Sequence, residues 1–551
     1  MSRKRFVKGK TTKITGGNHT MFSKENVVFN AKKVKMKGAE GVAFEDPITL
    51  EINNEKPIDV EIGVFFDGTG NNKFNTKTGL KGAPSGPYAL KGSYENDYTN
   101  VVRLFELYPD KQELIGKRQK VIMRIYVEGI GTLRDKLDDV MSLGTGEDTS
   151  LLLKIASKFV LPPFGGIAAE SFDVYNGDRG IKGKVNDAIS QIVEEIVEIR
   201  SLKRIDSLTF DVFGFSRGAA AARHFCNKLK EVITETISHK KYNMGGWQDS
   251  SYTETFTTTN NEGGGLYKKL KSKVPKLPEQ INVRFVGLFD SVAAILKIDA
   301  GDFKIEDASH HGIALDLAGV NAKQVVHLTA RDEHRKNFAL NKTNVGYSFS
   351  MPGVHSDIGG SYNTYKKEGD EEVAYLAYGT KATDKVRLEQ ERLNWIAEGW
   401  YLPDELIVED KSKSHIKYYG DYMERKMGRG HQIVETDHLY LLKGTKKVLN
   451  NYTYIPLRIM HELAKETVDV PFDKIKEDQF EVHPDLEEVY KVLHTIAFTN
   501  NSPLISYKDA RLLKHKFLHQ SANYNNPIIG KSGSGYIYPN EPAKKRIKHT
   551  N

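Results

Sequence analysis

Five short apolar runs recur in the first 350 residues, and each predicts a buried β-strand. The first four are rich in Val, Ile, Leu and Phe, the fifth has Val, Tyr and Phe in alternation with small residues, and Gly, Asp or Pro follows each within two residues, as at the ends of strands. Segments of helical periodicity separate the runs. The order therefore predicts an α/β fold, with a mainly parallel sheet flanked by helices. The runs are Ile58–Phe66, Val121–Val127, Leu208–Phe213, Ile281–Phe289 and Val345–Ser350.

Apolar positions at helical spacing lie between these runs. Glu95–Tyr108 and Gly180–Ile199 each place their apolar side chains on one face, as an amphipathic helix does. The segment Gln324–Phe338 also predicts a helix. The most apolar segment, Leu151–Ala169, is interrupted by lysines and prolines. It predicts either a lid or lipid-facing surface, or a helix of the core.

The pattern changes at both ends of the chain. Residues 1–55 are polar with short strand-like alternations, which predict a small β appendage; a disordered basic arm is the alternative. The α/β domain then spans 56–365. Over 366–551 the periodicity is helical and the composition more polar, so we expect a helical accessory region that packs onto the core. Its clearest predicted helices are Leu388–Trp400, Ile455–Glu466, Pro484–Phe498 and Tyr507–Gln520.

Composition narrows the class of protein. The 551 residues carry a net charge of +8, which fits an anionic membrane surface or an acidic partner, and we find no nucleic-acid-binding signature. The single cysteine, Cys226, excludes an intrachain disulfide. The basic first residues lack the apolar stretch of a Sec signal peptide, and no run reaches the ~18 apolar residues of a transmembrane helix. Export would need a secretion system that does not recognise a Sec signal peptide.

The first candidate for chemistry is the stretch Gly214-Phe-Ser-Arg-Gly218, which lies between a predicted strand and an Ala-rich helical pattern. A strand, a sharp turn and a helix in this order are typical of a nucleophile elbow. The turn strains the backbone of its middle residue, Ser216, so the residues two before and two after must be small, and both are glycine. The helix end offers N–H groups and a positive dipole to a developing oxyanion. A Gly-Ser turn without chemistry is the alternative.

Two further residues complete the order of a catalytic triad. Asp290 and His355 each follow a predicted strand, and serine, acid, histidine is the chain order of α/β hydrolases. Serine alone is a poor nucleophile near neutral pH, so His355 would take its proton and pass it to the leaving group. Asp290 would hold the imidazole in the right tautomer and stabilise the imidazolium. The sequence thus predicts a serine hydrolase.

A Gly-rich segment after the first strand, Asp67-Gly68-Thr69-Gly70, predicts an oxyanion-hole or substrate-positioning loop. The backbone N–H of Arg217 would supply one oxyanion donor and this loop another. A phosphate-binding loop would need a lysine that is missing here, and a plain strand-to-helix turn is a further alternative.

Each assignment has a competitor. Asp290 would otherwise only cap the following helix, and Asp67 is the other candidate for the acid. His355 would otherwise be a structural loop histidine, with His519 as the other candidate base. Asp357 is expected to support the site residues rather than to act on substrate. The histidines lack metal-ligand spacings such as H-E-x-x-H, so we expect no metal site and no cofactor.

Five motifs, in order, resemble those of the first class of type VI secretion lipase effectors. The resemblance spans roughly residues 58–365, and Arg331–Phe338 and Leu518–Ser521 also resemble that family. One departure is Phe289, where a tryptophan is expected before the acid. The five motifs are Phe65–Asn72, Gly129–Thr132, Gly214–Arg223, Gly287–Ala294 and Pro352–Gly360.

The resemblance implies an α/β-hydrolase core that hydrolyses acyl esters of glycerophospholipids, with Ser216, Asp290 and His355 as nucleophile, acid and base. It implies an antibacterial effector, made in the cytoplasm and exported without a signal peptide, that acts at the target-cell membrane from the periplasm. The implied partners are membrane phospholipid, the secretion spike or tube, and a cognate immunity protein. Residues 1–55 are similar to short leaders of such effectors and predict a delivery module, while the C-terminal region would face the membrane.

Three other functions stay open at this point. A serine hydrolase of this kind would also fit a soluble ester or a cell-wall amide as substrate. A non-catalytic spike adaptor would keep the fold with a dead site. A patatin-like Ser–Asp dyad would not need His355.

Overall fold

The structure is a computed structural model that describes the larger part of the chain. The predicted N-terminal module 1–55 and the apolar segment Leu151–Ala169 lie outside the described residues. The described residues are 58–79, 92–115, 118–136, 138, 179–200, 205–230, 233–242, 251–260, 264–274, 278, 280–293, 295–299, 302–306, 312–363, 369–419, 431–499, 501–525, 528–529, 536–537 and 540–549.

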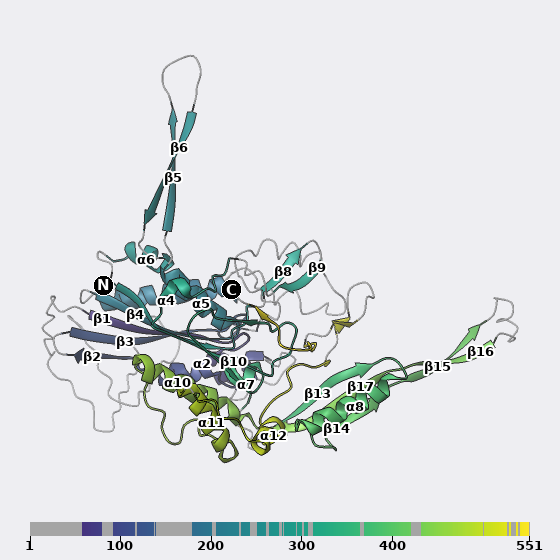
Figure 1. Cartoon of the computed structure of the whole chain (residues 1–551). Coiled ribbons are helices and arrows are strands. Elements are labelled where there is room, and N and C mark those ends of the chain that lie inside the picture. Colours follow the sequence, from purple (N-terminus) through teal and green to yellow (C-terminus); the bar gives the residue numbers. More distant parts are fainter. Residues whose placement is uncertain are drawn as a thin grey trace, which may run out of the picture. The chain divides into compact units, whose positions relative to one another are not determined.

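A seven-stranded sheet forms the centre of the fold (Figure 1). Strands β12-β10-β7-β4-β1-β3 lie side by side in parallel, and β2 closes one edge antiparallel to β3. All five predicted strands are present, which confirms the α/β class and the mainly parallel sheet. The strands are β1 (Ile58–Phe66), β2 (Lys111–Ile115), β3 (Arg118–Val127), β4 (Ile205–Phe215), β7 (Gln280–Phe289), β10 (Gln324–Ala330) and β12 (Tyr347–Met351).

The sequence prediction of a helix over Gln324–Phe338 is wrong. Its first half is β10, which pairs in parallel with β7 and β12. The strand is buried from Val325 to Ala330, so polar and apolar positions do not alternate and a short apolar run fits either period. His327 adds to the ambiguity, because a buried polar residue in the run imitates the polar face of a helix.

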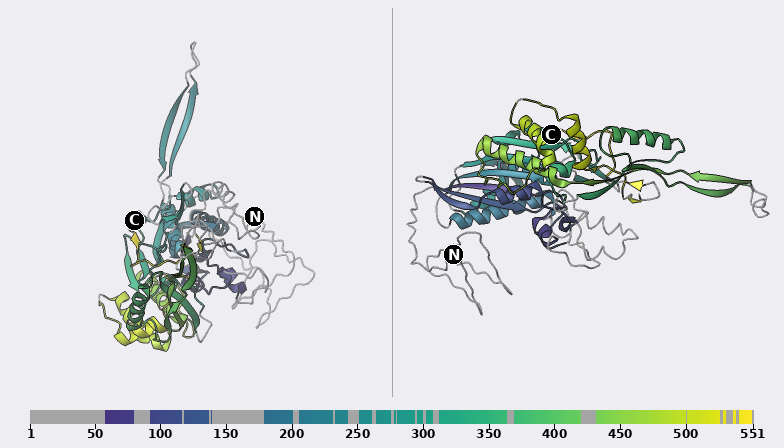
Figure 2. Two further views of the ribbon diagram at one scale, coloured as in Figure 1. Left: turned by 90° about the vertical axis from the view of Figure 1, so that its right-hand side faces the viewer. Right: turned by 90° about the horizontal axis from the view of Figure 1, so that it is seen from below.

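Helices cover both faces of the sheet. On one face α4 (Ile181–Arg200), α5 (Arg217–Lys230) and α6 (Gly264–Lys271) pack together and join one apolar core. On the other face α2 (Asn100–Leu107) and α10 (Tyr454–Val468) belong to a second apolar core. The view from below in Figure 2 shows α10, in yellow-green, across this second face. The sheet is therefore the middle layer between two helical layers.

The prediction of a purely helical accessory region is corrected, because this part of the chain also contains a second sheet. Strands β13 (Asp370–Gly379), β17 (Tyr440–Val448) and β14 (Leu406–Asp410) form a three-stranded antiparallel sheet. Strands β15 (Lys413–Tyr419) and β16 (His431–Asp437) form a hairpin. The four predicted helices are present as α8 (Asp384–Ala397), α10, α11 (Glu487–Phe498) and α12 (Tyr507–Lys516).

The central strand of this second sheet shows why the sequence pattern missed it. In β17 the buried positions alternate with half-buried ones, as in a strand with one covered face. Two of the buried positions, Gly444 and Lys446, are not apolar, and this breaks the hydrophobic alternation. The Lys446 ammonium donates to the carbonyl oxygens of Leu518 at 2.7 Å and Lys514 at 3.0 Å. Burial lowers the pKa of Lys446 to about 8.

Shorter elements connect these layers. After α5, strands β5 and β6 form an antiparallel hairpin.

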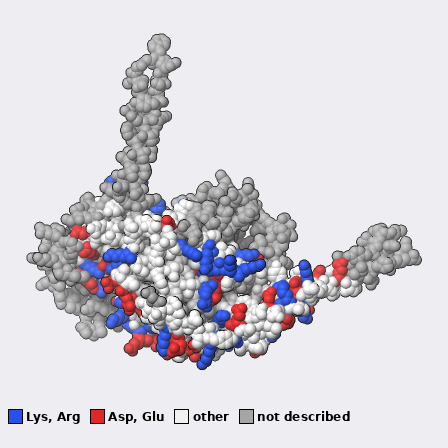
Figure 3. All heavy atoms as spheres, viewed as in Figure 1, with Lys and Arg blue, Asp and Glu red and all other residues white. Residues whose placement is uncertain are grey.

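Within the described residues no helix has the length and apolar character needed to cross a membrane. On the face shown in Figure 3, basic and acidic side chains are interspersed with uncharged surface. The shorter elements are α1 (Lys73–Gly79), η1 (Gly92–Tyr94), β5 (Ile233–Tyr242), β6 (Ser251–Asn260), β8 (Ile295–Asp299), β9 (Asp302–Glu306), η3 (Ala318–Val320), β11 (Leu340–Asn341), α7 (His355–Gly359), η4 (Asn450–Thr453), η5 (Pro484–Leu486), β18 (Ile528–Ile529), β19 (Tyr536–Ile537) and β20 (Lys548–His549).

A buried ionic cluster joins three neighbouring strands of the main sheet. Asp211 of β4 is fully buried and accepts hydrogen bonds from the Arg284 guanidinium of β7 at 2.9 and 2.5 Å. It also accepts one from the Tyr108 hydroxyl at 2.8 Å, and Arg284 reaches Glu61 of β1 at 2.9 Å. Burial raises the pKa of Asp211, and the bonds from Arg284 oppose that rise. The ionised form of Asp211 is therefore stabilised by the Arg284 guanidinium.

We expect Arg284→Met to lower the free energy of unfolding by about 3–5 kcal/mol, because it leaves a buried carboxylate without its partner. Denaturant-induced unfolding followed by fluorescence measures the change. The matched control is Lys120→Met, whose ammonium lies 2.6 Å from Glu61 at a more exposed position and should cost less than about 1 kcal/mol. Equal stability of the two variants would contradict this account of the cluster.

Candidate active site

Ser216 stands between the last residue of β4 and the first residue of α5, with a φ angle of 58°. This left-handed backbone is uncommon for any residue other than glycine, and it is the strained turn that the sequence predicts. A Cβ on Gly214 would lie 2.5 Å from the Gly218 carbonyl oxygen, and a Cβ on Gly218 would lie 2.2 Å from the Asp67 carbonyl oxygen. Only glycine fits at either position, which confirms both steric requirements.

Backbone hydrogen bonds tie this turn to the strand end that carries the acid. The Ser216 N–H donates to the Phe289 carbonyl oxygen at 3.1 Å, and the Val292 N–H donates to the Ser216 carbonyl oxygen at 3.3 Å. Asp290 lies between those two partners and also has a positive φ, 42°. The candidate nucleophile and acid are thus held side by side at the carboxyl ends of β4 and β7, where α/β folds build their sites.

The Asp290 carboxylate is fully buried and accepts four hydrogen bonds. His355 Nδ1 lies 2.6 Å from Oδ2, and the Ala330 N–H donates to Oδ1 at 2.8 Å. The Arg546 guanidinium donates to both oxygens, at 2.7 Å to Oδ1 and 2.8 Å to Oδ2. Burial alone would raise the pKa of Asp290, but the charge of Arg546 and the bond from His355 hold it well below its usual range. The carboxylate therefore stays ionised.

His355 is the first residue of α7 and is buried. Because the ionised Asp290 can only accept, Nδ1 carries the proton and Nε2 is the acceptor nitrogen. Nε2 is buried without a hydrogen-bond partner in the described part of the chain. The ring of Phe215, next to Ser216, packs on the imidazole with the ring centroids 4.6 Å apart. Burial lowers the pKa of His355 despite the pull of Asp290, so the imidazole is neutral near pH 7.

The structure therefore brings all three residues of the predicted triad into one region. Asp290 and His355 are in direct contact, while Ser216 joins them through the backbone of β7 and the ring of Phe215. Nε2 of His355 makes no hydrogen bond to Ser216 in this structure and keeps its acceptor capacity, which a general base requires.

The competing acid, Asp67, is fully used by other groups. It accepts from the Thr99 hydroxyl at 2.5 Å, the Tyr126 hydroxyl at 2.6 Å and the Gly68 N–H at 2.8 Å. Burial raises its pKa to about 6, and the hydroxyl bonds oppose that rise. These contacts anchor the loop after β1, and His355 is bonded to Asp290 instead.

The other histidines pair elsewhere. His519 Nδ1 lies 2.6 Å from Asp357, and the ring of Tyr362 stacks on it. Asp357 also accepts from the N–H of Val354, which directly precedes His355, at 2.9 Å. Asp357 thus holds the loop that carries the histidine, as the sequence suggests. Among the residues described, no cluster of His, Cys, Asp or Glu side chains is arranged to hold a metal ion.

The predicted oxyanion loop lies against the elbow. A Cβ on Gly68 would be 2.3 Å from the Phe215 ring, and Arg217 Nε donates to the Thr69 hydroxyl at 3.0 Å. Two amides of this loop are already engaged, because the Asp67 N–H donates to a carbonyl of β3 and the Gly68 N–H to the Asp67 carboxylate. The loop is in the expected place, but Asp67 and Gly68 have no free amide for a substrate oxyanion.

Two charged residues of the site escaped sequence analysis. Glu333 is fully buried, binds the Arg335 guanidinium at 2.9 Å through both oxygens, and accepts from the His355 N–H at 3.2 Å. It lies in one of the two short segments that resemble the lipase effectors, which is the only signal for it. Arg546 lies in no motif of the sequence, and only the fold brings it to Asp290.

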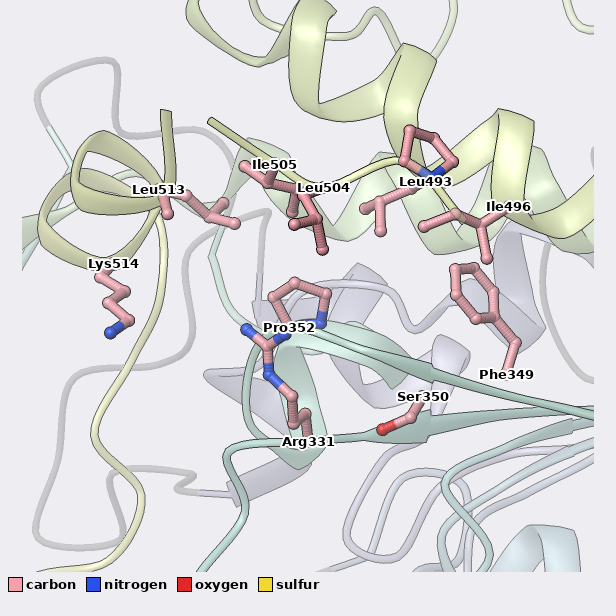
Figure 4. A pocket seen from close by; sticks show the side chains of 12 residues that line it. Arg331, Phe349, Ser350, Pro352, Leu493, Ile496, Leu504, Ile505, Leu513 and Lys514 are labelled. Carbon is pink, nitrogen blue, oxygen red and sulfur yellow. The ribbon is translucent and has the colours of Figure 1, made fainter. Parts of the chain in front are cut away.

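An apolar cavity of about 270 Å³ adjoins the loop that leads to His355 (Figure 4). Side chains of β12 and its following loop form one wall, and side chains of α11, α12 and the segment before α12 form the other. Leu504, on that segment, is 90% exposed. The close view shows Phe349 facing Leu493 and Ile496 across the cavity. The residues around it are Arg331, Phe349, Ser350, Pro352, Leu493, Ile496, Pro503, Leu504, Ile505, Ala510, Leu513 and Lys514.

Comparisons with known proteins point in one direction. A family model described as "T6SS, Phospholipase effector Tle1-like, catalytic domain" matches residues 61–398. A solved structure of the Tle1 effector bound to the VgrG spike of the type 6 secretion system aligns with a TM-score of 0.58 at 23% identity, over 90% of this chain and 94% of that one. An uncharacterised protein from Pseudomonas aeruginosa aligns with a TM-score of 0.34 at 17% identity, over 83% of this chain and 53% of that one. No curated protein matches the sequence.

The close backbone approach at the elbow makes a stability prediction. Gly218→Ala should lower the free energy of unfolding by at least about 1–3 kcal/mol, because the added Cβ meets backbone oxygens that cannot move aside. Gly265→Ala in α6 is the matched control, since its nearest neighbour would be 3.6 Å away; it should be neutral or slightly stabilising. Chemical denaturation of both variants measures these free energies. A Gly218→Ala protein with the free energy of unfolding of the wild type would refute the steric argument.

Proposed function

The chain belongs to the Tle1-like family of type VI secretion phospholipase effectors, and from this premise we propose that it is an A-type phospholipase that cleaves acyl esters with a Ser–His–Asp triad. The observation that carries the proposal is the 2.6 Å contact of His355 Nδ1 with Asp290, beside a serine in left-handed backbone geometry. Fold and site together fit an α/β-hydrolase-like domain.

In the proposed reaction Ser216 Oγ attacks the ester carbonyl carbon while His355 Nε2 takes the hydroxyl proton. The tetrahedral intermediate collapses, the C–O bond to the glycerol oxygen breaks, and His355 returns the proton to that oxygen, which releases a lysophospholipid. Water, activated by the same nitrogen, then hydrolyses the acyl-serine and frees the fatty acid. Throughout, Asp290 holds Nδ1 and stabilises the imidazolium.

Two backbone amides are assigned to the oxyanion. The Arg217 N–H lies at the N-terminus of α5, where the helix dipole favours negative charge. Thr69 is the better second donor within its loop, since the amides of Asp67 and Gly68 already donate elsewhere. The side chain of Thr69 is also bonded to Arg217, which links the two donors.

The same contacts weigh against the alternatives. A Ser–Asp dyad would give His355 no catalytic role, yet the histidine is bonded to Asp290 and packs on the ring of Phe215, the residue before Ser216. A dead adaptor would have no need for an ionised, buried Asp290 paired with a neutral imidazole. The cavity favours a lipid over a polar ester or a cell-wall amide, because most of the side chains that line it are apolar.

Delivery and partners form part of the proposal. The related Tle1 effector was solved bound to the VgrG spike, and by analogy this chain would ride on a spike protein. Residues 1–55 would serve as the delivery module, 56–365 as the catalytic core and 366–551 as the accessory region that meets the membrane. A cognate immunity protein would protect the producing cell, and the enzyme would act on membrane phospholipid from the periplasm of the target. We assign no metal or cofactor to the reaction.

Loss of the nucleophile tests the mechanism. Ser216→Ala should lower phospholipid hydrolysis by at least about 10³-fold, because only oxyanion stabilisation and binding are left. Fatty acid and lysolipid are both quantified from vesicles treated with purified protein. Ser207→Ala, at the far end of the same strand, is the matched control and should retain full activity. Equal activity of wild type and Ser216→Ala would remove the serine mechanism.

The exposed side chain of Leu504, beside the cavity, allows the proposed binding to membranes to be tested. Leu504→Asp should weaken vesicle binding and vesicle hydrolysis by roughly 10–100-fold, because a leucine that enters the bilayer contributes about 1.5–3 kcal/mol. Hydrolysis of a soluble short-chain ester should stay unchanged. Val386→Asp on α8, with a 77% exposed side chain, is the control for an apolar-to-acidic change elsewhere. Loss of vesicle binding in both variants, or in neither, would contradict a lipid-facing site at Leu504.

A further inference from the structure

Arg546 binds the carboxylate of Asp290, the acid of the proposed triad, through both terminal nitrogens of its guanidinium group. The two bonds, 2.7 and 2.8 Å long, join one nitrogen to each Asp290 oxygen. We propose that Arg546 is a positioning residue for the reaction, which fixes the orientation and the charge of Asp290 toward His355; this rests on the proposed function. The C-terminal tail that carries it is then part of the active site rather than an appendage.

The geometry leaves the carboxylate no freedom to turn. Oδ2 receives Arg546 and His355 Nδ1, and Oδ1 receives Arg546 and the Ala330 N–H. A bidentate pair fixes the carboxylate plane as well as its distance, because rotation breaks two charged bonds at once. Arg546 is itself 7% exposed, and its guanidinium also donates to the carbonyl oxygens of Ala330 and Phe338. The orientation of His355 thus depends on a side chain that never meets the reacting atoms.

The second part of the proposed role of Arg546 is its positive charge, which keeps Asp290 ionised. Asp290 lies in a dry site, where an anion without a counter-cation would take up a proton. Arg546 supplies the cation in contact with it. The other nearby titratable groups bind other partners: Glu333 binds Arg335, and His327 Nε2 accepts from the Ser291 N–H at 3.0 Å, while its Nδ1 has no partner among the described residues. Arg223 donates to the Ser291 hydroxyl and to the Asn341 carbonyl oxygen.

The tail is held in place by the same loops that carry the acid. β20 pairs in parallel with β11, and the Leu340 N–H donates to the Ile547 carbonyl oxygen at 2.9 Å. Asn341 of β11 in turn bonds the acid loop, since its N–H donates to the Ser291 carbonyl oxygen and its side chain accepts from the Ala293 N–H. Tail, β11 and acid loop therefore form one continuous hydrogen-bonded layer behind Asp290.

A purely structural ion pair would use the same contacts only to fasten the tail. The two roles differ in what they do to the reaction. A positioning residue changes kcat more than KM, and it changes the pH at which the Asp290–His355 pair takes up its proton. The active form needs Asp290 ionised and His355 neutral, and loss of the Arg546 charge favours proton uptake by both. The acid limb of the pH–rate profile should therefore move to higher pH.

The test compares wild type, Arg546→Ala, Arg546→Lys and Lys545→Ala in the full chain, with circular dichroism to verify folding. Arg546→Ala should lower kcat by about 10–100-fold at constant KM, and move the acid limb up by about one pH unit or more. Arg546→Lys should recover part of the rate, because it returns the charge without the fork. Lys545→Ala, an exposed neighbour, is the matched control and should behave as wild type.

Chemical rescue separates the two roles. Millimolar guanidinium should restore part of the kcat of Arg546→Ala by entering the vacated space, whereas urea at the same concentration should not. A structural fastening would show neither rescue nor a shifted pH profile, and a folded Arg546→Ala protein with wild-type kcat and pH profile would overturn the proposal. If Arg546→Ala does not fold, Arg546→Gln, which keeps part of the side chain's volume and its polarity without the charge, is measured in the same way.

A readout without lipid keeps this inference distinct from the proposed function. Wild type without phospholipase activity would refute the function alone. The NMR titration of the His355 imidazole would still report the Asp290–His355 pair, and proton uptake at higher pH in Arg546→Ala, which lacks the charge, supports the inference. An unchanged titration would overturn it, whatever substrate the enzyme takes.

Discussion

A buried negative charge sets the layout of this site. Asp290 lies at the carboxyl end of β7 with no exposure to solvent, and its ionised form persists only because four donors converge on it. One of those donors comes from the last described stretch of the chain. The pairing of β20 with β11, and the path of the segment between β10 and β12, both bring that donor to the carboxylate.

Three buried aspartates show how the same side chain acquires different properties in one sheet. Asp211 and Asp290 each bind an arginine side chain, the first within the sheet and the second at the carboxyl end of β7. Asp67, which has only hydroxyl and amide donors, has a pKa raised to about 6 by burial. The three carboxylates therefore differ: despite burial, the charge of Arg546 holds the pKa of Asp290 well below its usual range, whereas burial raises the pKa of Asp211 even against its bonds from Arg284.

Sequence reasoning reached the parts of the molecule that local rules control. Gly214, Ser216 and Gly218 could be read as an elbow because steric limits act within five residues, and the triad order followed from strand ends. It failed where tertiary contacts replace a local pattern. β10 is covered on both faces and holds a buried histidine, while β17 holds the buried Lys446, so neither shows the expected alternation. Arg546 could not be found, since only the fold brings it to Asp290.

The long sequence separation between acid and arginine has a consequence for the timing of synthesis. Arg546 follows Asp290 by 256 residues, so a growing chain carries the serine, the acid and the histidine well before it carries the cation. At elongation rates of ~5–20 residues per second, that interval lasts on the order of 10–50 s. During that interval Asp290 lacks one of the four donors that surround it in the folded protein. If Arg546 positions the acid as proposed, full activity depends on a segment that is made after all three residues of the triad.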